Sequence, residues 1–179
     1  YFLYDIPDDP DFLYVRADYT VDSGEKISKT SSTYTDTLFI EGFGQVKDYE
    51  VKLYSVDRND NVSAPIIETI TPMEANTNMV ASTLKVRPGF SALIAEWTND
   101  LKQTVDVYVR LSDGEVVAEK VLSSNSKDGF FLVENLQNKD YTVSTYVKDQ
   151  YGNISGVQDC GVLKPLSDAP LGKSGWTFL

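Results

Sequence analysis

The feature that most limits how this chain can fold is an internal repeat. Residues 47–63 align without gaps on residues 139–155, a shift of 92 positions, and eight of the 17 aligned residues are identical. When small gaps are allowed, residues 13–16 also match residues 107–110. A period of this length is the size of one small β-sandwich. We therefore expect the 179 residues to form two domains of the same kind.

The pattern within each repeat is that of antiparallel strands. In the second repeat Tyr141, Val143 and Val147 fall on one face of a strand, while the residues next to them in sequence fall on the other. Turn signals such as Pro88-Gly89 separate similar runs. No segment of a dozen residues shows helical periodicity. Besides the aligned segments, the runs predict strands over residues 2–6, 12–20, 37–40, 66–70, 83–86, 92–97, 105–111, 116–122, 130–133 and 157–163.

The second repeat also contains the residues of a tyrosine corner. Trp97 ends one strand, and Leu136 precedes Tyr141 by five residues at the start of another. Together with the turn at 152–155, these residues make the segment 91–162 resemble a fibronectin type III domain. We therefore predict an all-β chain of two tandem immunoglobulin-like, fibronectin type III-like antiparallel sandwiches. Trp97 and Tyr141 should be buried in the second.

The strand pattern also sets the expected domain limits. Residues 1–72 should form the first sandwich and residues 73–165 the second, meeting near Pro72–Asn78. A sandwich of seven strands needs one strand ahead of the first run, so we expect the first sandwich to lack its opening strand. The edge of that first run should then be exposed. Residues 166–179, with an isolated Trp176, read as a linker toward a C-terminal domain that is absent here.

Two further features extend the resemblance. Both repeats contain an Asp-x-x-x-Asn-x-Ser turn, at 57–63 and 149–155, and the second ends in Leu-Lys-Pro-Leu at 163–166. In this tandem arrangement the chain is similar to a lipoprotein family of Bacteroidota, in which two such domains precede a discoidin-like carbohydrate-binding domain. The resemblance implies a cell-surface (outer-membrane lipoprotein) or periplasmic location in a glycan-utilisation system. It supplies no ligand site for these two sandwiches.

Composition excludes several classes of function. The chain has no histidine, which rules out Ser–His and Cys–His nucleophiles and removes the commonest metal ligand. Most of its 27 acidic residues occur at turns or on polar strand faces, where solvation explains them. A net charge of −11 opposes binding to nucleic acid, and no stretch approaches the about 18 apolar residues of a membrane helix. We expect no enzymatic activity, no cofactor, no nucleic-acid partner and no transmembrane segment.

One run of oxygen-bearing side chains has the spacing of a calcium loop. Asp57, Asn59 and Asn61 alternate, and the second repeat keeps the two outer positions as Asp149 and Asn153. A shared structural turn is the simpler account. In that turn both aspartates accept hydrogen bonds from backbone amides, and both outer asparagines adopt the left-handed conformation. We therefore expect no metal site, with calcium at the first run as the alternative.

Outward Tyr and Arg side chains recur in both repeats. If the apolar residues of their strands face the core, these side chains form two sheet faces. One comprises Tyr14, Arg16 and Tyr54, and the other comprises Tyr108, Arg110 and Tyr146. Aromatic rings stack on sugars and guanidinium groups donate to hydroxyls, so each face is a candidate platform for carbohydrate or for a surface protein. The alternative is that Tyr–Arg pairs merely cover an exposed sheet.

The two interpretations make different demands on the second face. A ligand platform requires its three side chains to be exposed, adjacent and free of intramolecular partners. The leading functional hypothesis is a non-catalytic spacer that presents a neighbouring binding domain. The alternative is a module that binds carbohydrate or protein through the Tyr/Arg faces.

The single cysteine, Cys160, lies in the last strand of the second repeat and should pack as a small apolar side chain.

Overall fold

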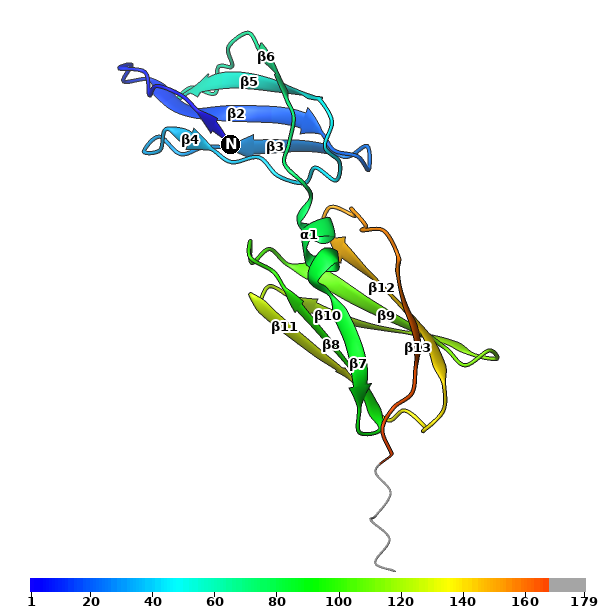
Figure 1. The fold of residues 1–179 in the computed structure, drawn as a ribbon. Helices are drawn as coiled ribbons and strands as arrows, with labels where there is room; N and C mark the ends of the chain where they lie inside the picture. The colour runs from blue at the N-terminus through cyan, green and yellow to red at the C-terminus, as the bar shows by residue number, and fades with distance from the viewer. Residues whose placement is uncertain (168–179) are drawn as a thin grey trace, which may run out of the picture. The chain divides into compact units, whose positions relative to one another are not determined.

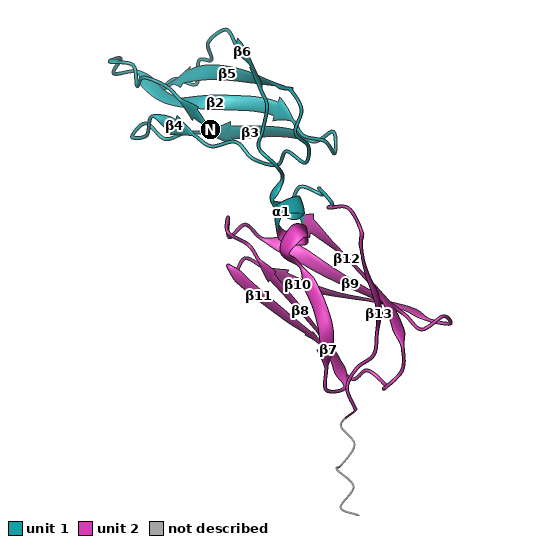
Figure 2. Cartoon of the chain, viewed as in Figure 1, with its two compact units in different colours: residues 1–79, 149–154 teal, residues 80–148, 155–179 magenta. Residues whose placement is uncertain are grey.

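The computed structural model describes residues 1–167. They form two compact units (Figure 2). Unit 1 contains residues 1–79 and 149–154, and unit 2 contains residues 80–148 and the described residues from 155 onward. Both units are built from antiparallel strands, so the all-β prediction is confirmed (Figure 1). Of the linker predicted over 166–179, residues 168–179, with Trp176, lie outside the described residues.

Unit 2 contains two sheets that follow the strand order of a fibronectin type III sandwich. Its strands alternate buried and exposed positions, as a sheet with one face toward a core requires. One sheet has the order β11 (Asp128–Val133), β8 (Ala92–Thr98), β7 (Lys85–Gly89). The other has the order β10 (Val117–Ser124), β9 (Val105–Ser112), β12 (Tyr141–Asp149), β13 (Gln158–Leu163).

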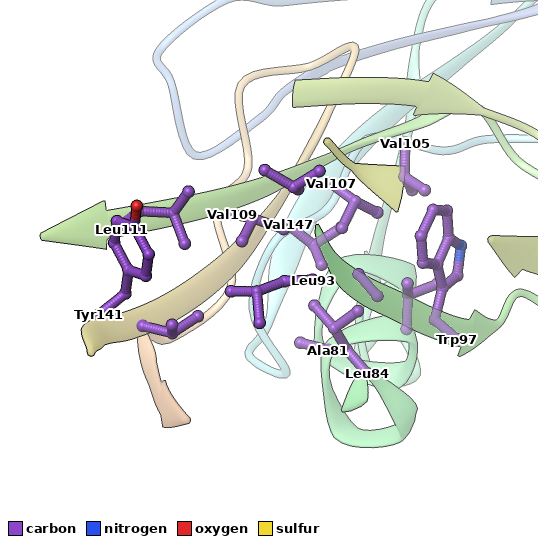
Figure 3. Packing of buried hydrophobic residues seen from close by; sticks show 14 residues of the cluster. Ala81, Leu84, Leu93, Trp97, Val105, Val107, Val109, Leu111, Tyr141 and Val147 are labelled. Carbon is purple, nitrogen blue, oxygen red and sulfur yellow. The ribbon is translucent and has the colours of Figure 1, made fainter. Parts of the chain in front are cut away.

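The core of unit 2 is a strip of inward-facing side chains (Figure 3). On β9 the alternate residues Val105, Val107 and Val109 are fully buried, and they pack in one cluster with residues of β8 and β12. Trp97 and Tyr141 belong to this cluster and are 4% and 8% exposed, which confirms the prediction that both are buried. Burial of this strip is the main driving force for pairing the two sheets.

A short helix that the sequence did not predict contributes to this core. α1 (Asn76–Thr83) is followed at once by β7, where a strand had been expected over residues 83–86. Eight residues are too few to show helical periodicity, yet Val80 and Ala81 are buried in the cluster.

The sequence predicted a turn at Pro88-Gly89, but both residues belong to β7 and the chain reverses after them. Proline is tolerated in β7 because this strand has a sheet neighbour on one side only.

The described residues contain no helix of the length and apolarity needed to cross a bilayer.

Unit 1 has the same sandwich plan with a smaller second sheet. Its larger sheet has the order β3 (Lys26–Thr30), β2 (Phe12–Thr20), β5 (Tyr49–Asp57), β6 (Ile66–Ile70). Its smaller sheet pairs only β1 (Phe2–Leu3) with β4 (Thr37–Leu38). Within residues 1–167, β1 therefore has one strand neighbour and one unpaired edge. Both strands are shorter than the predicted runs over 2–6 and 37–40.

Strand β3 was missed by the sequence analysis. Its five residues contain one apolar side chain, Ile27, so alternation could not reveal it. The strand forms because it extends the larger sheet beside β2, with Arg16 opposite Thr30 and Thr20 opposite Lys26. An edge strand with lysines on it also resists pairing with another chain.

The repeated Lys-Asp-Tyr segments have the same structural role in both units. Lys47 pairs with Asp22 and lies 5.1 Å from the centre of the Tyr49 ring. In unit 2, Lys139 pairs with Asp113 and lies 5.6 Å from the Tyr141 ring. In each case the aspartate follows the first strand of a hairpin, so the lysine ties that hairpin to the start of another strand. This shared contact explains why the lysine recurs in the repeat.

Among the described residues, Tyr49 and not Tyr141 brings its hydroxyl close to a backbone carbonyl as a tyrosine corner does. The Tyr49 hydroxyl lies 3.4 Å from the Gln45 carbonyl oxygen and donates to Asp22 Oδ2 at 2.6 Å. For Tyr141 the described residues provide no such bond. Burial, with the nearby Asp22 carboxylate, raises the pKa of Tyr49 to about 12. Burial alone would raise the pKa of Asp22, but hydrogen bonds from Lys47, Tyr49 and Gly44 outweigh it and lower that pKa.

We predict that Asp22→Asn destabilises unit 1 by about 1 to 2 kcal/mol at pH 7. Because the pKa of Asp22 is lower in the folded state, its stabilisation is complete above its unfolded pKa of about 4 and is lost as the pH falls through the folded value. Urea unfolding at pH 7 and at about pH 2.5 should therefore show a difference from wild type that shrinks with acid. Asp8→Asn, at an exposed position, is the matched control. A difference that is independent of pH would contradict this role.

A second prediction concerns the contact between Gly129 and Trp97. A Cβ at position 129 would lie 1.9 Å from Trp97 Cε2, inside the indole ring system. Gly129→Ala should therefore destabilise unit 2 by about 2 to 3 kcal/mol, because the buried indole cannot move aside without repacking the core. Gly156→Ala, where a Cβ meets no atom within 4 Å, should be nearly neutral. Equal melting temperatures for the two variants would show that this close contact does not exist.

Candidate functional site

The outward face of unit 2 brings its three predicted residues together. Tyr108 on β9 and Tyr146 on β12 stack with ring centroids 4.5 Å apart and an angle of 5° between the rings. Arg110 Cζ lies 5.8 Å from the centre of the Tyr146 ring. All three point away from the core, between buried residues of their strands. The prediction that they form one adjacent set is consistent with this geometry.

These residues are, however, not free of partners. Arg110 donates to Glu119 Oε2 from Nη2 at 2.9 Å and from Nε at 3.2 Å, because the two residues are opposite each other in the β9–β10 register. Burial, with a hydrogen bond to Glu119, raises the pKa of Tyr146. Each stacked ring has also lost one of its faces. A ligand platform was expected to have side chains free of intramolecular partners, and the unit 2 face does not meet that requirement.

The corresponding face of unit 1 is less completely paired. Arg16 and Tyr54 are opposite each other on β2 and β5, and the guanidinium carbon lies 4.6 Å from the ring centre. Arg16 Nη2 is 3.3 Å from Asp18 Oδ2, whereas its buried Nε finds no acceptor among the described residues. Tyr14 lies opposite the buried Val56 and is separate from this pair.

A shallow depression of about 720 Å³ lies over this face, and we call it the outer-face hollow. Residues of β2, β3 and β5 line it, among them Arg16, Asp18, Lys52 and Tyr54, while Tyr14 does not. Its charges are mixed, since Lys52 lies 3.6 Å from Glu50 along the same strand. Of the predicted site residues, Arg16 and Tyr54 therefore line one hollow, whereas the unit 2 residues are paired with one another and with Glu119.

The run with calcium-loop spacing is a hydrogen-bonded turn. Asp57 Oδ1 accepts from the backbone amides of Asn59 and Asn61, both at 2.8 Å, and Oδ2 accepts from Asn61 Nδ2 at 2.8 Å. Asp149 accepts in the same way from residues 151 and 153. Both carboxylate oxygens thus accept from N–H donors, as the structural-turn interpretation predicts. Residues 1–167 contain no cluster of three or more His, Cys, Asp or Glu that could hold a metal.

One detail of the turn prediction is wrong. The left-handed residues are Asp60, with φ of 62°, and Gly152, with φ of 82°, each one position before the expected asparagine. The asparagines instead use their side-chain amides to bond the aspartates. Cys160 is half-buried, packs against the core of unit 2 and has Sγ 3.8 Å from Thr145 Oγ1, as expected for a packing role.

The sequence analysis missed a second hollow in unit 1, which we call the loop hollow. It measures about 480 Å³ and is lined by residues 30–32, 34–37 and 39, around the connection from β3 to β4. Tyr34 and Phe39 border it and are 92% and 70% exposed. Two signals in the sequence pointed to it: a tyrosine within a run of Ser, Thr and Asp, and a phenylalanine at the outward position between Leu38 and Ile40.

Several solved structures are similar to this chain. The chain is similar to the SusE-like protein BT2857, with 17% identity and a TM-score of 0.45 over 51% of this chain. That match spans 32% of the length of BT2857. A two-domain fibronectin type III segment of chicken tenascin aligns over 88% of this chain and 87% of its own, with 16% identity and a TM-score of 0.41. Three fibronectin domains of chicken CNTN1 align with 12% identity and a TM-score of 0.37, over 95% of this chain and 65% of theirs.

Family models account for almost the whole sequence. Residues 1–72 match a model described as a domain of unknown function, DUF4959, and residues 73–174 match a second such model, DUF5126. No functionally curated protein matches the sequence. Since the second model covers more than half of the sequence, the chain belongs to the DUF5126 family.

Proposed function

We propose that residues 1–72 and 73–165 form two sandwiches that act as a non-catalytic spacer in a cell-surface lipoprotein of a glycan-utilisation system, where they present a neighbouring binding domain. The observation that carries this proposal is the self-pairing of the unit 2 face. There the outward Arg110 is held by Glu119 and the two tyrosines stack on each other. A face whose polar groups are already paired gains little from a ligand. The resemblance of the tandem sequence to surface lipoproteins supports the location.

The charge pattern of both units favours the same role. Several outward cations are paired across strands or along them, as in Arg87 with Glu96 and Arg16 with Asp18. Such pairs keep an exposed sheet soluble and contribute modestly to stability. Together with a net charge of −11, they give the chain a hydrated acidic surface. These properties suit a module that separates other domains.

The spacer proposal predicts the outcome of replacing Tyr108 and Tyr146 with Ala. Loss of the stacked pair should destabilise unit 2 by about 1 to 2 kcal/mol, while the glycan-array profile of the full-length protein stays unchanged. Thermal unfolding measures the first effect and the array measures the second. Phe130→Ala, at an exposed aromatic on the other sheet of unit 2, is the control. Loss of glycan binding at an unchanged melting temperature would instead identify the face as a ligand platform.

A second candidate function is a carbohydrate- or protein-binding module that uses the outer-face hollow of unit 1. The observation in its favour is the unpaired Nε of Arg16 beside Tyr54. An acceptor that entered the hollow and shifted the guanidinium would pair this donor, with Tyr54 as the stacking surface.

This candidate predicts that Tyr54→Ala lowers the affinity of residues 1–179 for a ligand about three- to tenfold, with a small change in stability. Titration followed by NMR would place the perturbed amides on β2 and β5. The same substitution at Tyr14, which lies outside the hollow, is the matched control. If Tyr54→Ala and Tyr14→Ala lowered the affinity equally, the outer-face hollow would not be the binding site, and the spacer proposal would remain.

A further inference from the structure

We propose that the loop hollow of unit 1 is a binding site for neutral carbohydrate, with Tyr34 and Phe39 as its stacking surfaces. The site is distinct from both Tyr/Arg faces and adds a contact with sugar to the spacer role. It depends on neither function proposed above, because none of its lining residues belongs to those faces.

The first argument is the exposure of the two rings. Tyr34, in the β3–β4 connection, is 92% exposed, and Phe39, directly after β4, is 70% exposed, whereas the neighbouring Leu38 is 1% exposed. The Tyr1 ring lies 5.9 Å from that of Phe39 at a tilt of 52°, so it leaves ring surface open to solvent. Aromatic surface left in water is unfavourable, and a sugar ring that stacks on it removes that cost. The tyrosines of unit 2, in contrast, already cover each other.

The second argument is that the loop is held in place before any ligand arrives. The Tyr4 hydroxyl donates to the Thr35 carbonyl oxygen at 2.6 Å and lies 2.6 Å from the Ser31 hydroxyl. The Tyr34 amide donates to Ser32 Oγ at 3.0 Å, which fixes the backbone that presents the ring. A site whose backbone is already ordered loses less conformational entropy when it binds.

The third argument is the chemistry of the lining. Apart from the two rings it consists only of Ser, Thr and one acid, Asp36, and it contains no basic side chain. Thr37 donates to Asp36 Oδ1 at 2.9 Å, which leaves Oδ2 as an acceptor for a ligand hydroxyl. Hydroxyl and carboxylate groups match the alternating donors and acceptors of a neutral sugar. Asp36 and the net charge of −11 repel anionic ligands, which favours neutral over acidic sugars.

The same features disfavour docking of a protein. A protein interface needs a continuous apolar core, on the order of several hundred Å². Here Thr35, Asp36 and Thr37 interrupt the apolar surface between the two rings. Addition of a strand at this place would depend on β4, and its two residues offer too few backbone groups for stable pairing.

The test is a titration of ¹⁵N-labelled residues 1–179 with neutral hexasaccharides, namely maltohexaose, cellohexaose, mannohexaose and xylohexaose, up to about 10 mM each, since two stacking contacts give millimolar affinity. We expect at least one of them to shift amides of residues 30–39. Tyr34→Ala and Phe39→Ala should each weaken that binding at least about fivefold with an unchanged melting temperature. Phe90→Ala, at a phenylalanine of unit 2 that is also 70% exposed, should bind as wild type.

Several results would overturn the proposal. These are the absence of shifts with all four sugars, shifts confined to β2 and β5, or equal weakening by Phe90→Ala. Tighter binding of the anionic hexagalacturonate than of the four neutral hexasaccharides would show that the site does not select neutral sugars. A dimer in sedimentation that Phe39→Ala dissociates would show that a second copy of the chain covers the rings instead. None of these outcomes depends on the spacer role, which is tested separately at Tyr108 and Tyr146.

Discussion

The alternation of side chains along each strand is the constraint on which the other features of this protein depend. Because successive side chains of a strand point to opposite faces, Tyr108 and Arg110 face outward when Val105, Val107 and Val109 pack against the opposite sheet. The same rule places Arg16 outward beside the buried Ala17. Burial of one face thus determines which residues are available on the other. It does not determine what those residues contact there.

The outward faces of the two units differ because of their neighbours across the sheet. In unit 2, Glu119 on β10 lies opposite Arg110 and pairs with it, so the guanidinium group has less to offer a ligand. In unit 1 the residue of β3 opposite Arg16 is Thr30, which offers no charge, and Arg16 turns to Tyr54 and Asp18. A single cross-strand difference therefore leaves Arg16 Nε without an acceptor in unit 1, whereas Arg110 Nε is paired with Glu119 in unit 2. This contrast supports a spacer role for unit 2 and leaves unit 1 as the place to seek a ligand.

Both units also show how the repeat is conserved within the chain for structural reasons. The recurring lysine pairs with a hairpin aspartate above a tyrosine ring in each unit. The recurring Asp-x-x-x-Asn turn bonds its own amides. The identical residues at matching positions therefore form the same turns and the same Lys–Asp ion pairs, and do not indicate a shared active site. The residues proposed to contact sugar, Tyr34 and Phe39, lie outside the best-aligned segment.

The sequence by itself determined the fold class, the seven-strand pattern of unit 2 and the outward direction of the Tyr and Arg side chains, because alternation and turn residues are local signals. It could not reveal β3, whose pairing with β2 supplies what its own residues lack, or α1, which is too short for periodicity and is stabilised by burial of Val80 and Ala81. It placed Arg16 and Arg110 in the same class, whereas only the cross-strand register decided that one is paired with a glutamate and the other is not. The backbone around the loop hollow is likewise held by the Tyr4 hydroxyl, through a bond to Thr35 between residues 31 apart in sequence that no local pattern encodes.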